Sequence, residues 1–395
     1  MKKQKNALGS PFKRGFAAVL GNERYQSITV PVFAILLSLL AAAVVLLIMG
    51  KNPLTAFASF LQGSGILPKP NYAAKKSMVT DLFSMLNMLT PMIFASLAVA
   101  VALKAGLFNI GVSGQMLVSG FAASVLVGYS DLPMGIALPL VLIIGIVGGA
   151  AVGALIGWLK HRFNINEVVS SIMLNYIFSY TVSFFINTRF IDPVSRQSRS
   201  VSSAARLTLT NVELGAIKLD LPLGMLLAIP MAFFVKFLLD KTRVGYEMKV
   251  VGLNRRAAEY AGINVGRNIV LSMAISGALA GLAGITFYMG YYNSIQPRVL
   301  ASLGFDSIAV CLLGNSNPIG ILFSSLLITV ISKGSNYLSS TANVPQEIAQ
   351  LITGLILLFS ACGTYIRYRV SATKDELRDL KKRAEGIKDE GGDRV

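Results

Sequence analysis

The chain has 395 residues, of which 54% are hydrophobic and only 14% are charged. A soluble domain carries about a quarter charged residues, so composition excludes a water-soluble protein and predicts one that is integral to a membrane. The net charge of +17 does not indicate nucleic-acid binding, because the Lys and Arg residues gather in the tails and between apolar runs, as in membrane proteins.

The apolar runs are long enough to be membrane spans, which need about 20 residues each. The first run follows a basic N-terminus without a small-residue cleavage site, so we interpret it as a retained span. Residues 304–332 hold two shorter apolar pieces, a half-length helix and a following span, split by Asn315-Ser-Asn-Pro318. The chain is therefore predicted to be an all-α, polytopic protein with ten crossings, at 28–50, 85–103, 107–129, 135–158, 167–187, 222–239, 269–291, 304–332 (two pieces) and 345–364.

The distribution of Lys and Arg predicts the orientation of these spans. Most of them lie in segments that are cytoplasmic if the N-terminus is inside, and an even number of crossings then puts both tails there. We predict a cytoplasmic tail over 1–27, a transmembrane domain over 28–364 with a cytoplasmic loop over 240–268, and a cytoplasmic tail over 365–395. Residues 51–66, in an outer loop, are a weak candidate for an amphipathic helix.

Glycine spacing predicts how some spans pack. Gly145, Gly149, Gly153 and Gly157 recur at every fourth position, and Gly277 and Gly281 repeat this spacing. Small residues on one helical face let backbones approach closely inside a membrane. We therefore assign both stripes to helix packing and not to ligand binding.

Several kinds of chemistry are not expected. Cys311 and Cys362 lie in apolar segments without metal-ligand neighbours, which indicates core thiols and no metal site. His161 lies in a short basic turn, so catalysis by histidine is not expected. The sequence has no phosphate-binding G-x-x-x-x-G-K-[ST] loop, so the chain is not expected to be an ATPase or another enzyme. We also expect essentially no ionisable residue in mid-span, which argues against coupling to an ion gradient.

Polar residues at lipid depth are costly and are the candidates for a solute path. On the predicted span 107–129, Asn109 and Ser113 share a helical face, and Gln115 is offset from them. They either hydrogen-bond a polar solute or bond neighbouring helices, a contact worth under about 2 kcal/mol. Asn175 and Tyr176, within the predicted span 167–187, are candidates of the same kind. Asp306, at the outer start of the half-length helix, either interacts with the helix dipole or contacts solute.

The segment Gly252-Leu-Asn-Arg-Arg-Ala-Ala-Glu-Tyr-Ala-Gly-Ile263 is a charged, Ala-rich island in the cytoplasmic loop. Its alanines favour a helix that Gly262 can end. The helix either docks a soluble partner, with Tyr260 as an aromatic anchor, or lies solvated on the lipid headgroups. The residues assigned to this surface are Gly252, Asn254, Arg255, Arg256, Ala257, Glu259, Tyr260 and Gly262.

Three motifs together resemble one family. They are the island itself, Phe108-Asn-Ile-Gly-Val-Ser-Gly-Gln115 upstream of it, and Gly304-Phe-Asp-Ser-Ile-Ala-Val-Cys-Leu-Leu-Gly314 downstream. Together they are similar to motifs of the ABC-importer permeases for ribose-type sugars, branched-chain amino acids and nucleosides. The resemblance runs from about residue 85 to about residue 365. It implies two inverted-repeat halves and makes 252–263 the ATPase-coupling helix. Family members commonly carry Glu where this chain has Ser113, so no carboxylate acts there.

The resemblance also implies partners and a location. We expect a bacterial plasma-membrane importer with a second homologous permease, a cytoplasmic ABC ATPase that binds ATP and Mg, and an extracellular substrate-binding lipoprotein. No cofactor is expected in this chain. The segment 105–112 and the long loop after the first span look most like nucleoside-type permeases, and a path of amides and hydroxyls suits a neutral polar solute. Simple sugars such as ribose are the alternative substrate, and an ion-coupled secondary transporter is the alternative class.

Overall fold

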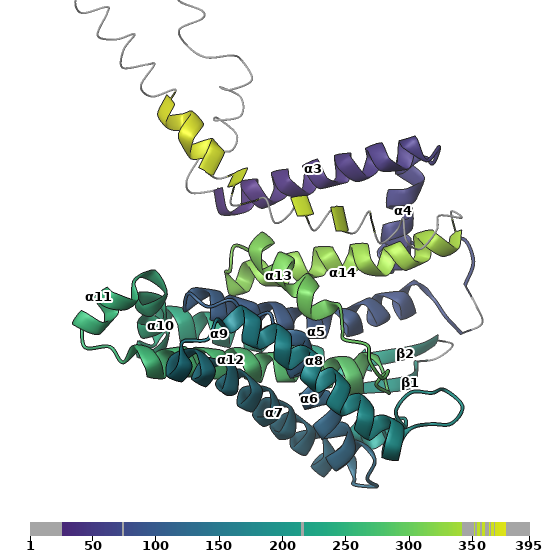
Figure 1. Cartoon of the computed structure of the whole chain (residues 1–395). Helices are drawn as coiled ribbons and strands as arrows, with labels where there is room; N and C mark the ends of the chain where they lie inside the picture. Colours follow the sequence, from purple (N-terminus) through teal and green to yellow (C-terminus); the bar gives the residue numbers. More distant parts are fainter. Residues whose placement is uncertain are drawn as a thin grey trace, which may run out of the picture. The chain divides into compact units, whose positions relative to one another are not determined.

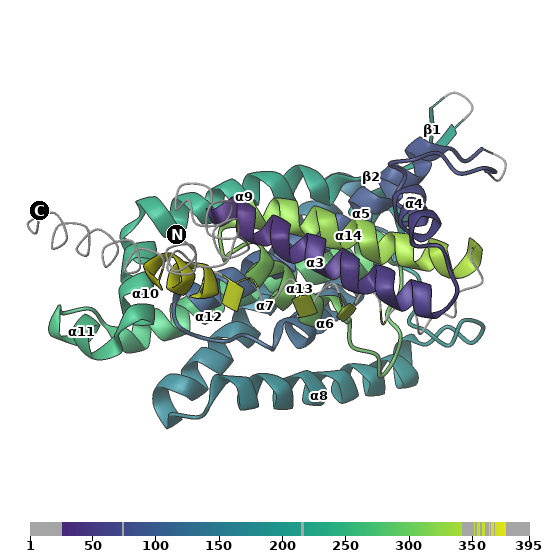
Figure 2. The ribbon, with the colours of Figure 1, turned by 90° about the horizontal axis from the view of Figure 1, so that it is seen from above.

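The computed structural model describes residues 26–72, 75–214, 217–341, 351, 354–355, 358–359, 363, 365–366 and 368–376. Unit 1 comprises residues 1–50 and 354–395 and contains α3 (Gln26–Ile48), and unit 2 comprises residues 51–353. Figures 1 and 2 show the elements of unit 2. In chain order these are α4 (Pro53–Gly63), α5 (Met78–Lys104), α6 (Val112–Ala123), η1 (Ser124–Gly128), α7 (Met134–Phe163), α8 (Glu167–Phe185), η2 (Ile186–Phe190), η3 (Ser203–Ala205), β1 (Thr208–Leu214), β2 (Ile217–Pro222), α9 (Leu223–Lys241), α10 (Arg243–Leu253), α11 (Arg255–Tyr260), α12 (Val265–Thr286), η4 (Phe287–Tyr291), α13 (Leu303–Leu313) and α14 (Pro318–Thr341).

The described residues are mostly helical, as predicted, but they hold fewer full-length spans than expected. Six helices are long and apolar enough to cross a membrane: α5, α7, α8 with η2, α9, α12 with η4, and α14. The stretch 36–48 followed by 53–63 makes a seventh if the two count as one broken span. The predicted span 345–364 falls largely outside the described residues. Ten full-length crossings are therefore not present in the part of the chain that the structure describes.

The predicted span 107–129 is interrupted at its start. Gly106 has φ +68°, a left-handed conformation that glycine adopts without strain. A side chain there would also collide with the backbone of Gly252, since a Cβ on Gly106 would lie 2.9 Å from the Gly252 Cα. Helix α5 therefore ends at Lys104, and helix resumes only at Val112. The prediction that Asn109 and Ser113 share a helical face is wrong, because Asn109 precedes the helix.

Helices α7 and α12 pack backbone to backbone, which confirms the assignment of the glycine stripes to packing. A Cβ on Gly149 would collide with the carbonyl oxygen of Gly277, and a Cβ on Gly281 would collide with that of Gly145. The two stripes thus face each other, and Figure 1 shows the two helices side by side. Close backbone approach of this kind is how small residues stabilise helix pairs in lipid.

Residues 51–66 do contain a helix, α4, and it packs against α14. A Cβ on Gly63 would lie 2.7 Å from the Tyr337 Cβ and 2.8 Å from the Gly334 Cα, so the two helices cross where both lack side chains. The half-length helix is confirmed as α13, but the span that follows it is longer than predicted. Helix α14 begins at Pro318 and continues to Thr341, nine residues past the predicted end at 332.

The segment 188–221, predicted to be an outer loop, contains the only strands among the described residues, which the all-α prediction did not include. Strands β1 and β2 form an antiparallel hairpin with a register shift between Leu209 and Val212. Figure 1 shows this hairpin and the pair α10–α11 at opposite ends of unit 2. A chain that leaves the membrane can pair its backbone groups in a sheet, which an isolated loop at lipid depth cannot do.

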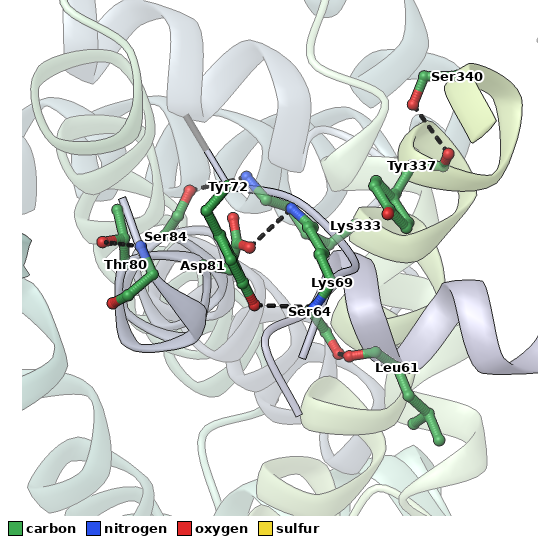
Figure 3. Close-up of polar contacts among 11 residues, drawn as sticks. Leu61, Ser64, Lys69, Tyr72, Thr80, Asp81, Ser84, Lys333, Tyr337 and Ser340 are labelled. Atoms are coloured by element: carbon green, nitrogen blue, oxygen red, sulfur yellow. Dashed lines mark hydrogen bonds and ion pairs between the residues drawn. The ribbon is translucent and has the colours of Figure 1, made fainter. Parts of the chain in front are cut away.

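A group of charged side chains lies between α5, α14 and the segment after α4 (Figure 3). Lys69 Nζ lies 2.7 Å from Asp81 Oδ2 and 4.7 Å from the centre of the Tyr337 ring. Lys333 donates a hydrogen bond to Ser84 Oγ at 2.8 Å. Lys333 is a residue of α14 with eight helical residues after it. The expectation that the spans carry essentially no ionisable residue is therefore wrong for α14, because that helix was predicted to end before Lys333.

Candidate functional site

Asn109, Gln115 and Ser276 form a buried hydrogen-bond network. The Asn109 amide Nδ2 donates to Gln115 Oε1 at 3.0 Å and to Ser276 Oγ at 2.8 Å, and its Oδ1 accepts from Gly111 N at 2.9 Å. Ser276 in turn donates to the carbonyl of Ala98 at 2.6 Å. Asn109 and Gln115 are 1% and 0% exposed. The network therefore joins the non-helical segment before α6 to α12 and α5.

Ser113 and Asn175 tie the start of α6 to two other parts of unit 2. Ser113 Oγ donates to the carbonyl of Ala301 at 2.9 Å. Asn175 Oδ1 accepts from Gly114 N at 2.9 Å, and its Nδ2 donates to the carbonyl of Ile110 at 3.1 Å. Gly304 packs directly on Ser113, which favours a small side chain at position 113. Four of the predicted path residues therefore meet around the start of α6.

A cavity of about 470 Å3 opens beside this network, along α8. We call it the α8 cavity. Its described lining residues are Ile172, Asn175, Tyr176, Ser179, Tyr180, Arg298, Leu300 and Phe305. Of the predicted path residues, Asn175 and Tyr176 are among them. Asp306 lies in the first turn of α13, next to Phe305, but does not line the cavity.

Apart from Asn175 and Tyr176, the residues of the cavity wall were not singled out in the sequence. Asn175 and Ser179, and likewise Tyr176 and Tyr180, are four residues apart, so this polar and aromatic face of α8 could have been found from helical spacing. Figure 2 shows α8 at the edge of unit 2. Tyr176 and Tyr180 are 57% and 64% exposed, so this face of α8 has no partner among the described residues.

The island 252–263 and the helix before it form a protrusion of two short helices, α10 and α11. Asn254 separates them, and its Oδ1 accepts from Ala257 N at 3.1 Å as the N-cap of α11. Gly262 has φ +76° and follows the helix, which confirms the predicted helix end. Gly252 is half-buried and packs against the turn after α5, since a Cβ there would lie 2.8 Å from Gly106 N.

The protrusion has a buried side and an exposed side. Ala258, Met248 and Val251 are buried in a core with residues of α5, α7 and α12. Leu253 and Tyr260 are 87% and 94% exposed, and Leu253 was not singled out in the sequence. The predicted surface residues Arg255, Arg256, Ala257 and Glu259 are also exposed. Large apolar side chains that are exposed to water on a rigidly packed element are typical of a protein-binding surface.

A charged group fixes the base of the protrusion to α12. The Asn268 amide donates to Glu247 Oε2 at 3.0 Å, and Arg243 Nε donates to Glu247 Oε1 at 2.7 Å. These two donors lower the pKa of Glu247 below its ordinary value, because both favour the carboxylate. The position of α10, and with it of α11, is thus coupled to a helix of the central α7–α12 pair.

Comparisons with known proteins show the family of this chain. A family model described as the branched-chain amino acid transport system permease component matches residues 82–361. The nucleoside ABC transporter permease protein NupB of Lactococcus lactis is 34% identical over 361 residues, which cover 89% of this chain and 96% of NupB. The guanosine ABC transporter permease protein NupP of Bacillus subtilis is 33% identical over 354 residues, which cover 89% of this chain and 98% of NupP. A glucose ABC transporter permease protein of Haloferax volcanii is 27% identical, with 87% and 90% covered.

Proposed function

The chain belongs to the family of branched-chain amino acid transport system permease components, and from this premise we propose that it is the nucleoside-conducting permease subunit of an ATP-driven importer. The observation that carries the substrate class is the 33–34% identity, over 89% of the chain, to two permeases named for nucleosides and guanosine. The apolar spans make it a multi-pass membrane protein.

The solute path runs along the exposed face of α8. The α8 cavity supports this assignment because its wall carries an amide, hydroxyls and aromatic rings, with Arg298 as the only charged side chain among the described lining residues. A neutral solute with hydrogen-bonding groups suits such a wall. Asn109, Ser113 and Gln115 stand behind it and hold α6 in place, and Asp306 stands at the outer start of α13. A second homologous permease covers the free face of α8.

The protrusion α10–α11 transmits force from a separate ATPase. Its exposed Tyr260 and Leu253 on a buried base support this role, since binding energy at protein interfaces concentrates in anchored apolar side chains. The ATPase binds ATP and Mg, so this chain itself is not an enzyme. In the complete importer, ten crossings in two inverted-repeat halves leave both tails cytoplasmic, and an extracellular lipoprotein delivers the nucleoside.

Uptake measurements test the substrate class. A strain that lacks this gene should lose uptake of labelled guanosine, and the gene supplied on a plasmid should restore it. Uptake of labelled ribose, glucose and leucine should be the same in all three strains. Restoration of sugar or leucine uptake with no change for guanosine would assign the permease to another substrate.

A further inference from the structure

A second cavity lies at the end of unit 2 that carries the hairpin β1–β2, between η4, the segment after it and the loop 190–202. Its volume is about 310 Å3. We call it the outer cavity. Six of its lining residues carry polar groups: Gln197, Tyr288, Tyr292, Ser294, Gln296 and Ser302.

The walls of the outer cavity are held together across nearly 100 residues of sequence. Ser198 N donates to the carbonyl of Ile295 at 2.9 Å, and Ile295 N donates to Ser198 Oγ at 2.8 Å. Ser294 Oγ donates to Gln197 Oε1 at 2.6 Å. These bonds fix both rims, so the cavity is formed before any ligand enters. A preformed site loses less conformational entropy on binding than a flexible one.

Tyr288 forms a rigid part of this wall. Its side chain is only 4% exposed, and its hydroxyl has no exposed surface, so a ligand in the cavity cannot reach that group. The ring cannot turn away, because it packs on Gly120, where a Cβ would lie 2.6 Å from it. It belongs to the π-helical turn η4, a feature frequent at functional sites.

The remaining lining residues indicate the chemistry of the ligand. The Phe287 ring lies 5.0 Å from both the Tyr288 and Tyr292 rings, centre to centre, at steep angles of 87° and 71°. Tyr292 is 50% exposed, so one of its sides can stack on a planar ring. None of the described lining residues is charged. A neutral aromatic heterocycle that bears acceptors and hydroxyl groups matches this wall, whereas a phosphate or an amino acid would bring an unpaired charge.

We propose that the outer cavity is a nucleoside-binding subsite, in which the base stacks on Tyr292 and the amide and hydroxyl groups of the wall hydrogen-bond the nucleoside. The inference rests on the proposed function and extends it by a second site. Its volume lies at the small end of ligand pockets, which span about 300–1,000 Å3. Leu300 lines both the outer cavity and the α8 cavity. A nucleoside therefore occupies this subsite before it enters the solute path along α8.

Thiol labelling of the assembled importer tests occupancy. Gln296 is exposed and lines the cavity, so Gln296→Cys, made after Cys311 and Cys362 are replaced by Ser, should react with a small polar thiol reagent. Guanosine should slow the reaction, and ribose and guanosine monophosphate should not. A labelling rate that guanosine leaves unchanged, or equal protection by ribose or by the monophosphate, would overturn the proposal.

One variant and one control test the stacking contact. Tyr292→Ala removes the stacking ring and should raise the guanosine concentration needed for protection by about tenfold or more. Tyr246→Ala is the control, because Tyr246 is also an exposed tyrosine but lies on α10 and lines neither cavity. Equal effects of Tyr246→Ala and Tyr292→Ala would contradict the assignment.

The subsite and the nucleoside-permease function can be disproved independently. If the wild-type importer takes up guanosine but shows no protection at position 296, only the subsite is wrong. If it takes up no guanosine at all, the proposed function itself is wrong.

Discussion

The side-chain amide of Asn109 is hydrogen-bonded to other groups of the protein. Both of its polar atoms are bonded within the protein, to Gln115, Ser276 and Gly111. In this conformation the interhelical interpretation of Asn109 is therefore favoured over solute contact. Asn175, in contrast, is bonded at the start of α6 and also lines the α8 cavity.

Replacement of Asn109 tests that interpretation. Asn109→Leu should reduce the amount of assembled complex, because it leaves the buried Gln115 amide and the Gly111 N–H without their partner, at about 1–3 kcal/mol each. Uptake per assembled complex should change little. Detergent-extracted complex can be quantified by gel filtration alongside uptake. Normal assembly with abolished uptake would instead assign Asn109 to the solute path.

The charge on Asp81 should matter more than charges at the surface. Asp81→Asn leaves Lys69 and the nearby Lys333 without a carboxylate, in a site where the Lys69 and Asp81 side chains are only 17% and 20% exposed. Loss of one partner of a buried pair costs about 3 kcal/mol, so the thermal midpoint of the purified complex should fall by several degrees. Glu213→Gln, whose pairs with Lys75 and Lys218 are 41–61% exposed, should cost under about 1 kcal/mol. Equal falls in the thermal midpoint for Asp81→Asn and Glu213→Gln would contradict this prediction.

At the scale of elements, the packing of α7 against α12 requires residues without side chains at the contact. Gly149→Leu should prevent assembly, because even a Cβ at that position collides with the carbonyl of Gly277. Gly135→Ala, on the same helix but with no atom within 4 Å of the added Cβ, is the matched control and should assemble normally. The measurement is the yield of folded complex after detergent extraction. Full assembly of Gly149→Leu would show that the two helices do not touch there.

The protrusion can be tested without disturbing its base. Replacement of Arg255, Arg256 and Glu259 by Ala changes only exposed side chains, so insertion should be normal while ATPase association weakens and uptake is lost. The matched control replaces Lys75, Lys218 and Glu213 by Ala, which removes two cations and one acid from exposed positions at the hairpin β1–β2. Co-purification of the ATPase measures the association. Normal transport by the first variant would exclude a docking role for these residues.

At the scale of the whole molecule, energy for transport should come only from a partner. Liposomes that contain the purified chain alone should take up no guanosine under a proton or sodium gradient, and should hydrolyse no ATP. Lys333 does not change this expectation, because its ammonium group is bonded to Ser84 and is not placed in either cavity. Gradient-driven uptake that a protonophore or sodium ionophore abolishes would identify a secondary transporter instead.

The sequence by itself determined the features that depend on local order. Run lengths located α5, α7, α8, α9 and α12, glycine spacing identified packing faces, and the alanines before Gly262 predicted α11. Each follows from the fixed rise and period of a helix, which a short window of residues specifies.

Only the tertiary structure decided which of these elements meet. It set Gly149 against Gly277 and bonded Asn109 to Ser276, which is 167 residues away. It also formed the outer cavity from loops nearly 100 residues apart and continued α14 past residue 332, through Thr341. Helical period says which face a residue occupies but not which helix covers that face, because that choice depends on the packing of all the helices together.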